Sequence, residues 1–281
     1  MGDWSLGVGY WVLGTGLVYL ILSLFLAVLK MNEINRIMKN ILLVVLLLSS
    51  TLLTAQDVVS IGFKTGLTFS TFDGPLETNA NGDELESQSY TTGFNVGALV
   101  NFRLTDFFGV RTELLYIQKG TEFNYDGNSY FIFDPSGQRI VTTGEREMIL
   151  EVTNSYIEIP LMGYAKFGPI EFQGGAYVSA LVNATASGNL KYRPSNAQVS
   201  SASEIEFNLD YNYYRDEPGE FLGELKLDNV IINGNRIDVP ETLAAYYEQQ
   251  QEDGNLYNTI DYGLIGGVAF YLNGGLFINL R

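Results

Sequence analysis

The chain has 281 residues and a net charge of -16, and it contains neither cysteine nor histidine. The acidic balance excludes nucleic acid as an expected partner. The missing cysteines exclude disulfides and thiolate metal sites, and the missing histidines remove the commonest general base and metal ligand. We therefore expect no cofactor and no metal. The 18 Tyr and 17 Phe favour strands over helices.

Two apolar runs lie near the N-terminus. Trp11–Leu29 is long enough to cross a bilayer as a helix. Met38–Gln56 has a short basic start, an apolar core and a small, polar end, which is typical of a secretory signal peptide. Because such a peptide normally begins a chain, we predict that Met38 is the initiator. Residues 1–37 are then a hydrophobic extension from a wrongly assigned start; an inner-membrane anchor over 11–29 is the alternative.

The rest of the chain, 57–281, alternates with a period of two. In Thr91–Arg103, one parity holds Thr92, Phe94, Val96, Ala98, Val100 and Phe102, and the other is small or polar apart from Leu99. Successive side chains of a strand point to opposite faces, so one face of this strand is apolar. The same pattern predicts strands at about 58–72, 107–123, 154–168, 169–186, 258–272 and 275–281. In 107–123, Leu115 and Ile117 break the pattern, which suggests a bulge.

The connections between these strands alternate between short and long. Three are tight, at 104–106, 168–169 and 273–275, and three are long, at 73–89, 124–153 and 188–257. This alternation is typical of a transmembrane β-barrel, which has short periplasmic turns and long external loops. Apolar faces would then meet lipid, where a sheet must close on itself. A soluble β-sandwich also alternates and is the alternative fold.

The predicted fold class is all-β: an antiparallel, up-and-down, eight-stranded transmembrane barrel preceded by N-terminal hydrophobic helices. Only about seven strands are recognisable, and barrels of this kind have even strand numbers. We therefore predict that about seven strands are encoded and that the sequence is truncated or frame-shifted in the last hairpin. The alternative is that part of 138–153 supplies a strand outside the membrane or extends a hairpin.

Charged residues on the second parity would point into the barrel. An eight-stranded interior is just wide enough to be filled by side chains, so we predict a structural charge network there. Its members are Lys64, Arg111, Glu113, Glu158, Lys166, Glu171 and Asp261. Glu113 and Glu158 are the candidates for a catalytic carboxylate pair, but we favour ion pairing and predict that the protein is not an enzyme.

The long external loop 188–257 is the most acidic part of the chain. It carries thirteen Asp or Glu against five Lys or Arg, a net charge of -8. Tyrosine is common at recognition sites, so the loop is a candidate partner-binding segment. Its tyrosines are Tyr211, Tyr213, Tyr214, Tyr246 and Tyr247. The alternative is a solvated lid.

Several segments resemble a known family. GFKTGLTFSTF, ELLYIQKG (Glu113–Gly120), YIEIPL (Tyr156–Leu161), GGAYVSALV and DYGLIGGVAFYL follow one another in the chain. Together they resemble the PorT-like outer-membrane β-barrel family of Bacteroidota over about 58–186 and 258–281. The resemblance implies a small eight-stranded barrel in the outer membrane of a Gram-negative cell, and the predicted signal peptide implies Sec-type export. Its namesake is linked to type IX protein secretion.

We therefore expect a non-catalytic structural or recognition role through the external loops, in secretion or surface assembly. The alternatives are a surface adhesion or ligand-binding module and a histidine-independent outer-membrane hydrolase. Expected partners are outer-membrane lipid and lipopolysaccharide, together with other secretion or surface proteins. The sequence leaves the oligomeric state open.

Overall fold

The computed structural model describes residues 2–12, 58–133, 139–195, 204–232, 235–249, 256–272 and 275–281. The predicted signal peptide and nearly all of the predicted helix at 11–29 lie outside these ranges. Within them, no helix has the length and apolar character needed to cross a membrane.

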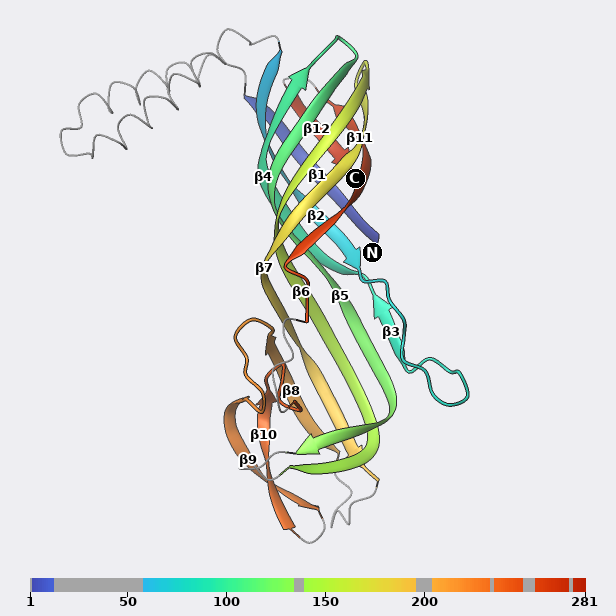
Figure 1. The fold of residues 1–281 in the computed structure, drawn as a ribbon, viewed down its shortest axis with the longest axis vertical. Helices are drawn as coiled ribbons and strands as arrows, with labels where there is room; N and C mark the ends of the chain where they lie inside the picture. The colour runs from blue at the N-terminus through green and yellow to red at the C-terminus, as the bar shows by residue number, and fades with distance from the viewer. Residues whose placement is uncertain are drawn as a thin grey trace, which may run out of the picture.

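The described chain consists of strands and their connections (Figure 1). The strands are β1 (Gly2–Val12), β2 (Val59–Thr71), β3 (Glu86–Ser89), β4 (Thr91–Arg103), β5 (Phe108–Phe133), β6 (Ile140–Phe167), β7 (Ile170–Pro194), β8 (Ile205–Asn212), β9 (Phe221–Ile232), β10 (Asn235–Leu243), β11 (Ile260–Tyr271) and β12 (Leu276–Leu280).

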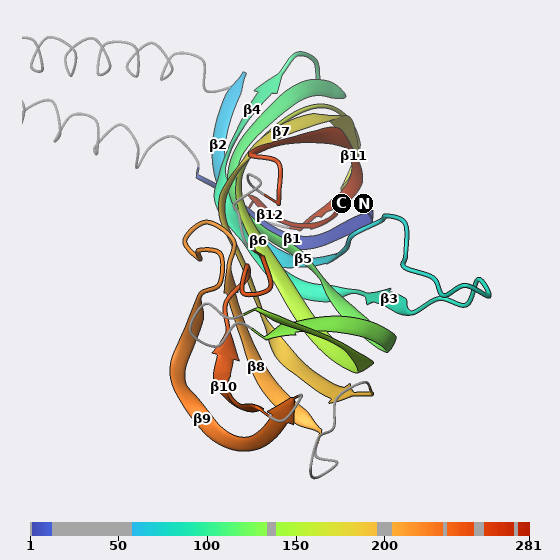
Figure 2. The ribbon, with the colours of Figure 1, turned by 60° about the horizontal axis from the view of Figure 1, so that its bottom comes forward.

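Eight of these strands form a closed ring, which Figure 2 shows from an oblique angle. The order around the ring is β1, β2, β4, β5, β6, β7, β11, β12 and back to β1. Every pairing in the ring is antiparallel. The seven strands predicted from the alternation are all present, so the barrel architecture is confirmed.

The eighth strand is β1, which lies between β12 and β2. It pairs with β2 from Gly2↔Thr71 to Val12↔Ile61 and with β12 from Leu6↔Leu280 to Tyr10↔Leu276. The prediction that only about seven strands are encoded is therefore wrong, since eight described strands form the ring. Residues 2–12, which were grouped with a hydrophobic extension, have strand periodicity instead: Leu6 and Val8 are exposed, whereas Ser5 and Gly7 are buried.

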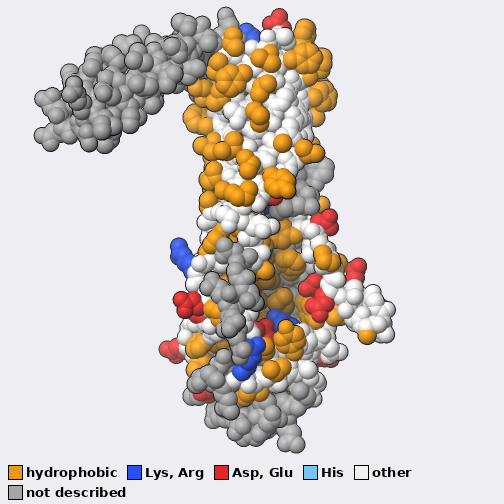
Figure 3. Space-filling view, viewed as in Figure 1, with side chains coloured by type: hydrophobic (Ala, Val, Ile, Leu, Met, Phe, Trp, Pro, Cys, Tyr) orange, Lys and Arg blue, Asp and Glu red, His pale blue; other side chains and the backbone are white. Residues whose placement is uncertain are grey.

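The outer face of the ring is apolar and its inside is charged. Phe63, Leu67, Phe94, Leu161 and Phe172 point outward, and Figure 3 shows such side chains as a band around the upper part of the molecule. Arg111, Glu113, Glu158 and Glu171 are buried on the other face. This arrangement suits a strand with lipid on one side and a filled lumen on the other.

The bulge predicted in β5 is absent. β5 keeps one register with β4 from Asn95↔Ile117 to Arg103↔Gly109, and one register with β6 along its whole length. Leu115 and Ile117 are buried inside the ring, so apolar residues fill part of the lumen. The register shift lies between β6 and β7 instead, where Ser155 faces Asn183 and Tyr156 faces Leu181, which makes Val182 the extra residue.

β5, β6 and β7 continue beyond the ring on the side of the long loops (Figure 1). The β5–β6 pairing runs to Phe133↔Ile140, which confirms the alternative that residues 138–153 extend a hairpin. β8 pairs with β7, β10 with β8 and β9 with β10, and the β8–β10 pairing is parallel. We call this part, formed by residues 120–133, 139–155, 183–194, 204–232 and 235–249, the projecting sheet.

Candidate functional site in the lumen and the projecting sheet

Ion pairs fill the lumen. Lys64 Nζ lies 3.6 Å from Glu113 Oε2, and Arg111 Nη1 lies 2.7 Å from Glu171 Oε1. Lys119 Nζ lies 2.9 Å from Glu158 Oε2. All six side chains are at most 2% exposed. Each buried charge thus has a partner, which is the condition under which charged groups persist away from water.

Arg281 links two of these pairs across the lumen. Its Nη1 donates to Glu113 Oε2 at 2.8 Å and its Nη2 donates to Glu158 Oε1 at 3.3 Å. The two carboxylates considered as a catalytic pair are therefore bridged by a guanidinium and also paired with Lys64 and Lys119. This geometry makes them members of a structural network.

The predicted network is assembled with two differences. Lys166 has no carboxylate within ion-pair distance among the described residues; its Nζ lies 3.6 Å from the centre of the Tyr271 ring. Asp261 lies at the network's edge, where its Oδ2 accepts a hydrogen bond from the Tyr177 hydroxyl at 3.1 Å and lies 4.0 Å from Lys119 Nζ.

Sequence reasoning missed four members of the network. They are Lys119, Arg281, Gln173 and Tyr271. Lys119 has the same parity as Arg111 and Glu113, so the alternation of the strand was sufficient to predict that it faces the lumen. Gln173 accepts a hydrogen bond from Arg111 Nη1 at 2.9 Å, and the Tyr271 hydroxyl accepts one from Arg111 Nη2 and donates one to Glu171.

Aromatic rings connect the ends of the barrel strands to the projecting sheet. Phe72 packs on Phe123 and Tyr257 with ring centres 6.2 and 6.0 Å apart, and Tyr257 packs on Tyr213 at 5.2 Å. Burial raises the pKa of Tyr257 to about 12 and of Tyr211 to about 12. It also raises the pKa of Tyr213. These hydroxyls stay protonated and neutral, as apolar surroundings require.

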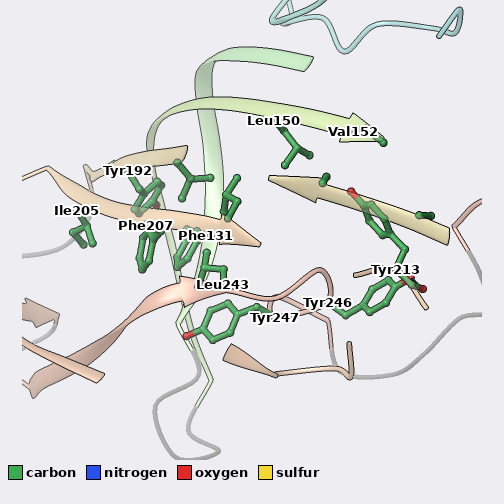
Figure 4. Packing of buried hydrophobic residues seen from close by; sticks show 14 of the residues in the cluster. Phe131, Leu150, Val152, Tyr192, Ile205, Phe207, Tyr213, Leu243, Tyr246 and Tyr247 are labelled. Carbon is green, nitrogen blue, oxygen red and sulfur yellow. Dashed lines mark hydrogen bonds between the residues drawn. The ribbon is translucent and has the colours of Figure 1, made fainter. Parts of the chain in front are cut away.

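The projecting sheet has a core of its own (Figure 4). The Phe131 ring stacks on Phe207 at 5.0 Å, and Phe133 and Tyr192 lie 4.7 and 5.2 Å from it. The Tyr192 hydroxyl bonds to that of Thr142 at 2.8 Å. Because β5, β7 and β8 all contribute rings, the sheet folds over and is held by the burial of large aromatic surfaces.

Most of the predicted partner-binding tyrosines lie in this core. Tyr213, Tyr246 and Tyr247 are buried, and Tyr211 is partly buried. The Tyr246 hydroxyl donates to the backbone oxygen of Tyr213 at 3.0 Å. Tyr214 is the exposed member of the set, so four of the five pack within the molecule.

An acidic groove of about 530 Å³ lies where the loop before β3 meets the projecting sheet. Glu84, Glu86, Asp126 and Glu147 contribute carboxylates, and Figure 3 shows acidic side chains gathered beside β3. The groove is lined by Glu84, Leu85, Glu86, Ser87, Asn124, Tyr125, Asp126, Glu147, Met148, Ile149, Asn189 and Lys191. Its volume is typical of a ligand site.

The cation of the groove is already engaged. Lys191 Nζ lies 3.5 Å from Glu204 Oε1 and 3.8 Å from Glu206 Oε1. Arg193, the next residue on that face of β7, pairs with Glu145 and Glu204. The groove therefore presents excess negative charge above the apolar side chains of Leu85, Met148 and Ile149, a combination that suits a cationic, partly apolar ligand.

The model of one protein family, described as outer membrane protein beta-barrel domain, matches residues 54–281. The chain belongs to this family. Searches of curated proteins and of solved structures found no match. The family match places the barrel in the outer membrane, so the apolar band of the ring is its lipid-facing surface.

The outer-membrane barrel domain covers seven of the eight ring strands, from β2 to β12. β1 lies outside the matched residues, although it closes the ring. The projecting sheet and the acidic groove lie inside them. The family match therefore spans the projecting sheet as well as the barrel strands β2 to β12.

Proposed function

We propose that this outer-membrane barrel protein is not an enzyme and that it recognises a surface or secreted protein through the acidic groove of its projecting sheet. The observation that carries the proposal is the continuity of β5, β6 and β7 from the lipid-facing ring into a sheet with its own aromatic core. A rigid scaffold that holds a charged groove away from the membrane is suited to binding a partner.

The electrostatics of the groove support a basic partner segment. Four carboxylates face the groove, while Lys191 is paired with Glu204 and Glu206. A Lys- or Arg-bearing segment would gain favourable electrostatics, and an apolar residue beside it would cover Leu85 and Ile149. Charged complementarity of this kind raises association rates and selects partners.

Secretion or surface assembly is the process that we propose, in line with the PorT-like resemblance and its link to type IX secretion. Sec-type export would deliver the chain to the outer membrane. The paired charges of the lumen support a structural role for the barrel. Arg281, Lys119 and Arg111 form ion pairs with carboxylates across its interior. An adhesion module would use the same groove with a ligand from outside the cell.

The test is complementation in the native host. The gene is deleted and replaced by wild type, by the groove variant Asp126→Lys/Glu147→Lys, or by the control Asp210→Lys. Asp210 is an exposed acid of β8 that does not line the groove. We expect the deletion to change which proteins reach the cell surface, measured by mass spectrometry, and only wild type and the control to restore them.

Two outcomes would contradict the proposal. Full restoration by the groove variant would remove the groove as the recognition site. An unchanged set of surface proteins in the deletion strain would remove the role in secretion or surface assembly, and would leave adhesion to a ligand from outside as the function to examine.

A further inference from the structure

A second groove, of about 610 Å³, lies on the outer face of the ring. It shares no residue with the acidic groove of the projecting sheet, and we call it the lipid-side groove. Its volume is typical of clefts that bind small molecules. Strands β1, β2, β4 and β12 line it with residues on their outward parity: Val8, Phe63, Thr65, Val96, Ala98 and Leu276.

The lipid-side groove forms because small side chains lie beside large ones. The strand register places Thr65 between Val8 and Val96, and it places Ala98 directly opposite Phe63. Side chains opposite one another on a sheet lie about 5 Å apart. The phenyl ring of Phe63 therefore rises beside the single methyl group of Ala98, and the difference in height makes the outer face concave at this place.

The polar groups that border the lipid-side groove are engaged within the protein. The Thr65 hydroxyl donates a hydrogen bond to the backbone oxygen of Asn95 at 3.1 Å. Lys64 belongs to the lining, but its Nζ lies 3.6 Å from Glu113 Oε2 in the lumen and its side chain is 1% exposed. A polar occupant would leave its own hydrogen bonds unmade, which is costly away from water. The groove therefore suits an apolar occupant.

The lipid-side groove lies in the half of the ring that is nearer the short turns. Leu276 is the first residue of β12, and Ala98 lies five residues before Arg103, the last residue of β4. Five residues correspond to about 17 Å along a tilted strand, which is within one leaflet of a bilayer. Short turns face the periplasm in barrels of this kind. The groove therefore opens to the inner leaflet of the outer membrane, which consists of phospholipid.

We propose that the lipid-side groove is a binding site for one acyl chain of an inner-leaflet phospholipid. The family match and the apolar band of the ring make lipid the surroundings of this face, so the groove is continuous with a surface that lipid already covers. An acyl chain is apolar and flexible, and it needs no hydrogen bonds to follow a curved floor. A hollow that no chain entered would lose the dispersion contacts of its walls.

Shape is what distinguishes this site from the rest of the lipid-facing surface. A chain that moves from bulk lipid into the groove leaves one apolar environment for another, so the hydrophobic effect contributes little and packing decides. In the groove, a chain touches walls such as Phe63 and Val8 as well as the floor at Ala98. At outward residues outside the groove, such as Val178, it touches the ring from one side.

Photo-cross-linking of the full chain in phosphatidylcholine vesicles tests the proposal. The probe is a phosphatidylethanolamine with a diazirine near the end of one acyl chain, and mass spectrometry locates the labelled residues after illumination. Val96 in the groove and Val178 outside it form a matched pair, because they are 46% and 48% exposed. We expect about fivefold more label on Val96, since the walls of the groove add several dispersion contacts to the chain.

A variant that fills the groove provides a second measurement. Ala98→Phe places an apolar ring in the groove and should reduce the label on Val96 to the level of Val178. The control Ala176→Phe adds the same ring at an exposed, outward residue of β7 that does not line the groove, and it should leave the label on Val96 unchanged. Lipopolysaccharide added to the vesicles should also leave it unchanged, whereas unlabelled phosphatidylethanolamine should reduce it.

Four results would overturn the proposal. Equal label on Val96 and Val178 in the unsubstituted protein would show ordinary lipid contact, whether or not the variants fold. Label that Ala98→Phe does not reduce would place the chain outside the groove. Competition by lipopolysaccharide would assign the groove to the outer leaflet. Because the chain has no cysteine of its own, a disulfide between two Val96→Cys chains, at a higher yield than between two Val178→Cys chains, would assign the groove to a second copy of this chain.

Discussion

The ring and the projecting sheet are built from the same strands with opposite polarity. In the ring, β6 buries Glu158 and exposes Ile157 and Ile159; in the projecting sheet it buries Leu150 and Val152 and exposes residues such as Glu147 and Glu151. The inward parity of β6 does not change, but the character of its side chains does. Where the outer side faces lipid, the exposed parity of β6 is apolar and the buried parity is charged. Where the outer side faces water, the buried parity is apolar and acidic residues lie on the exposed parity.

β7 makes the same change with a switch of parity. Ser179 and Leu181 face inward in the ring, and Ala184 and Ala186 are buried in the projecting sheet. The extra residue, Val182, lies between them. A bulge at this boundary allows the strand to bend from the barrel into the sheet.

The largest effect is expected from breaking the lumen network. Glu158→Ala leaves Lys119 and Arg281 with one buried partner fewer each, and uncompensated buried charge costs about 3–5 kcal/mol. The measurement is urea unfolding of the protein in lipid vesicles. Glu147→Ala, an exposed acid on the same strand, should change the free energy of unfolding by less than about 0.5 kcal/mol; equal effects would contradict the comparison.

Truncating an aromatic side chain in the core of the projecting sheet should destabilise that sheet and leave the ring unchanged. Phe131→Ala removes a ring that packs on Phe133, Tyr192 and Phe207, and such truncations cost about 3–4 kcal/mol. We expect faster amide exchange in β8 and β10 and unchanged exchange in β2 and β4. Faster exchange throughout would show that the two regions unfold as one unit.

Two substitutions on the outer side of β6 test the difference between the ring and the projecting sheet directly. Ile159→Lys places a charge on the lipid face of β6 and should destabilise the barrel by about 2–4 kcal/mol. Glu151→Ile, eight residues earlier on the outer side, should lie within about 0.5 kcal/mol of wild type. Folding yields in vesicles at increasing urea concentration give both values, and a reversed order would contradict the assignment of the membrane boundary.

The smallest effect concerns alkaline pH. The pKa of Tyr257 is raised to about 12 by burial, whereas that of an unfolded tyrosine is about 10. The folded state therefore holds its proton longer, and stability that is fully present below pH of about 10 falls as pH rises toward about 12. We expect a loss of about 2 kcal/mol, which Tyr257→Phe should reduce. An identical alkaline decline in that variant would contradict the prediction.

The ring strands and most of the lumen network were predictable, because a period of two is visible in a single strand and assigns each charge to a face. Lys119 shares that parity, but the apolar Leu115 and Ile117 lie between it and Glu113, and they were interpreted as a break in the pattern. The strand β8 within 188–257 was not recognised, because its exposed parity carries Glu206, Asn208 and Asp210 and resembles a solvated loop. In β1, alternation is present, yet its partners Thr71 and Leu280 are distant in sequence, and local pattern carries no information about such pairings.

The single register that β5 and β6 keep from Phe108↔Ala165 to Phe133↔Ile140 has a mechanical consequence. The hairpin is a continuous ribbon with a contour length of about 85 Å, which runs from the short turns at one end of the ring into the projecting sheet, where it bends (Figure 1). A pull on its tip along the strands would load the flanking β4–β5 and β6–β7 hydrogen bonds in shear, where many bonds share the force. The barrel is then an anchor whose resistance to traction comes from the length of its pairing with its neighbours.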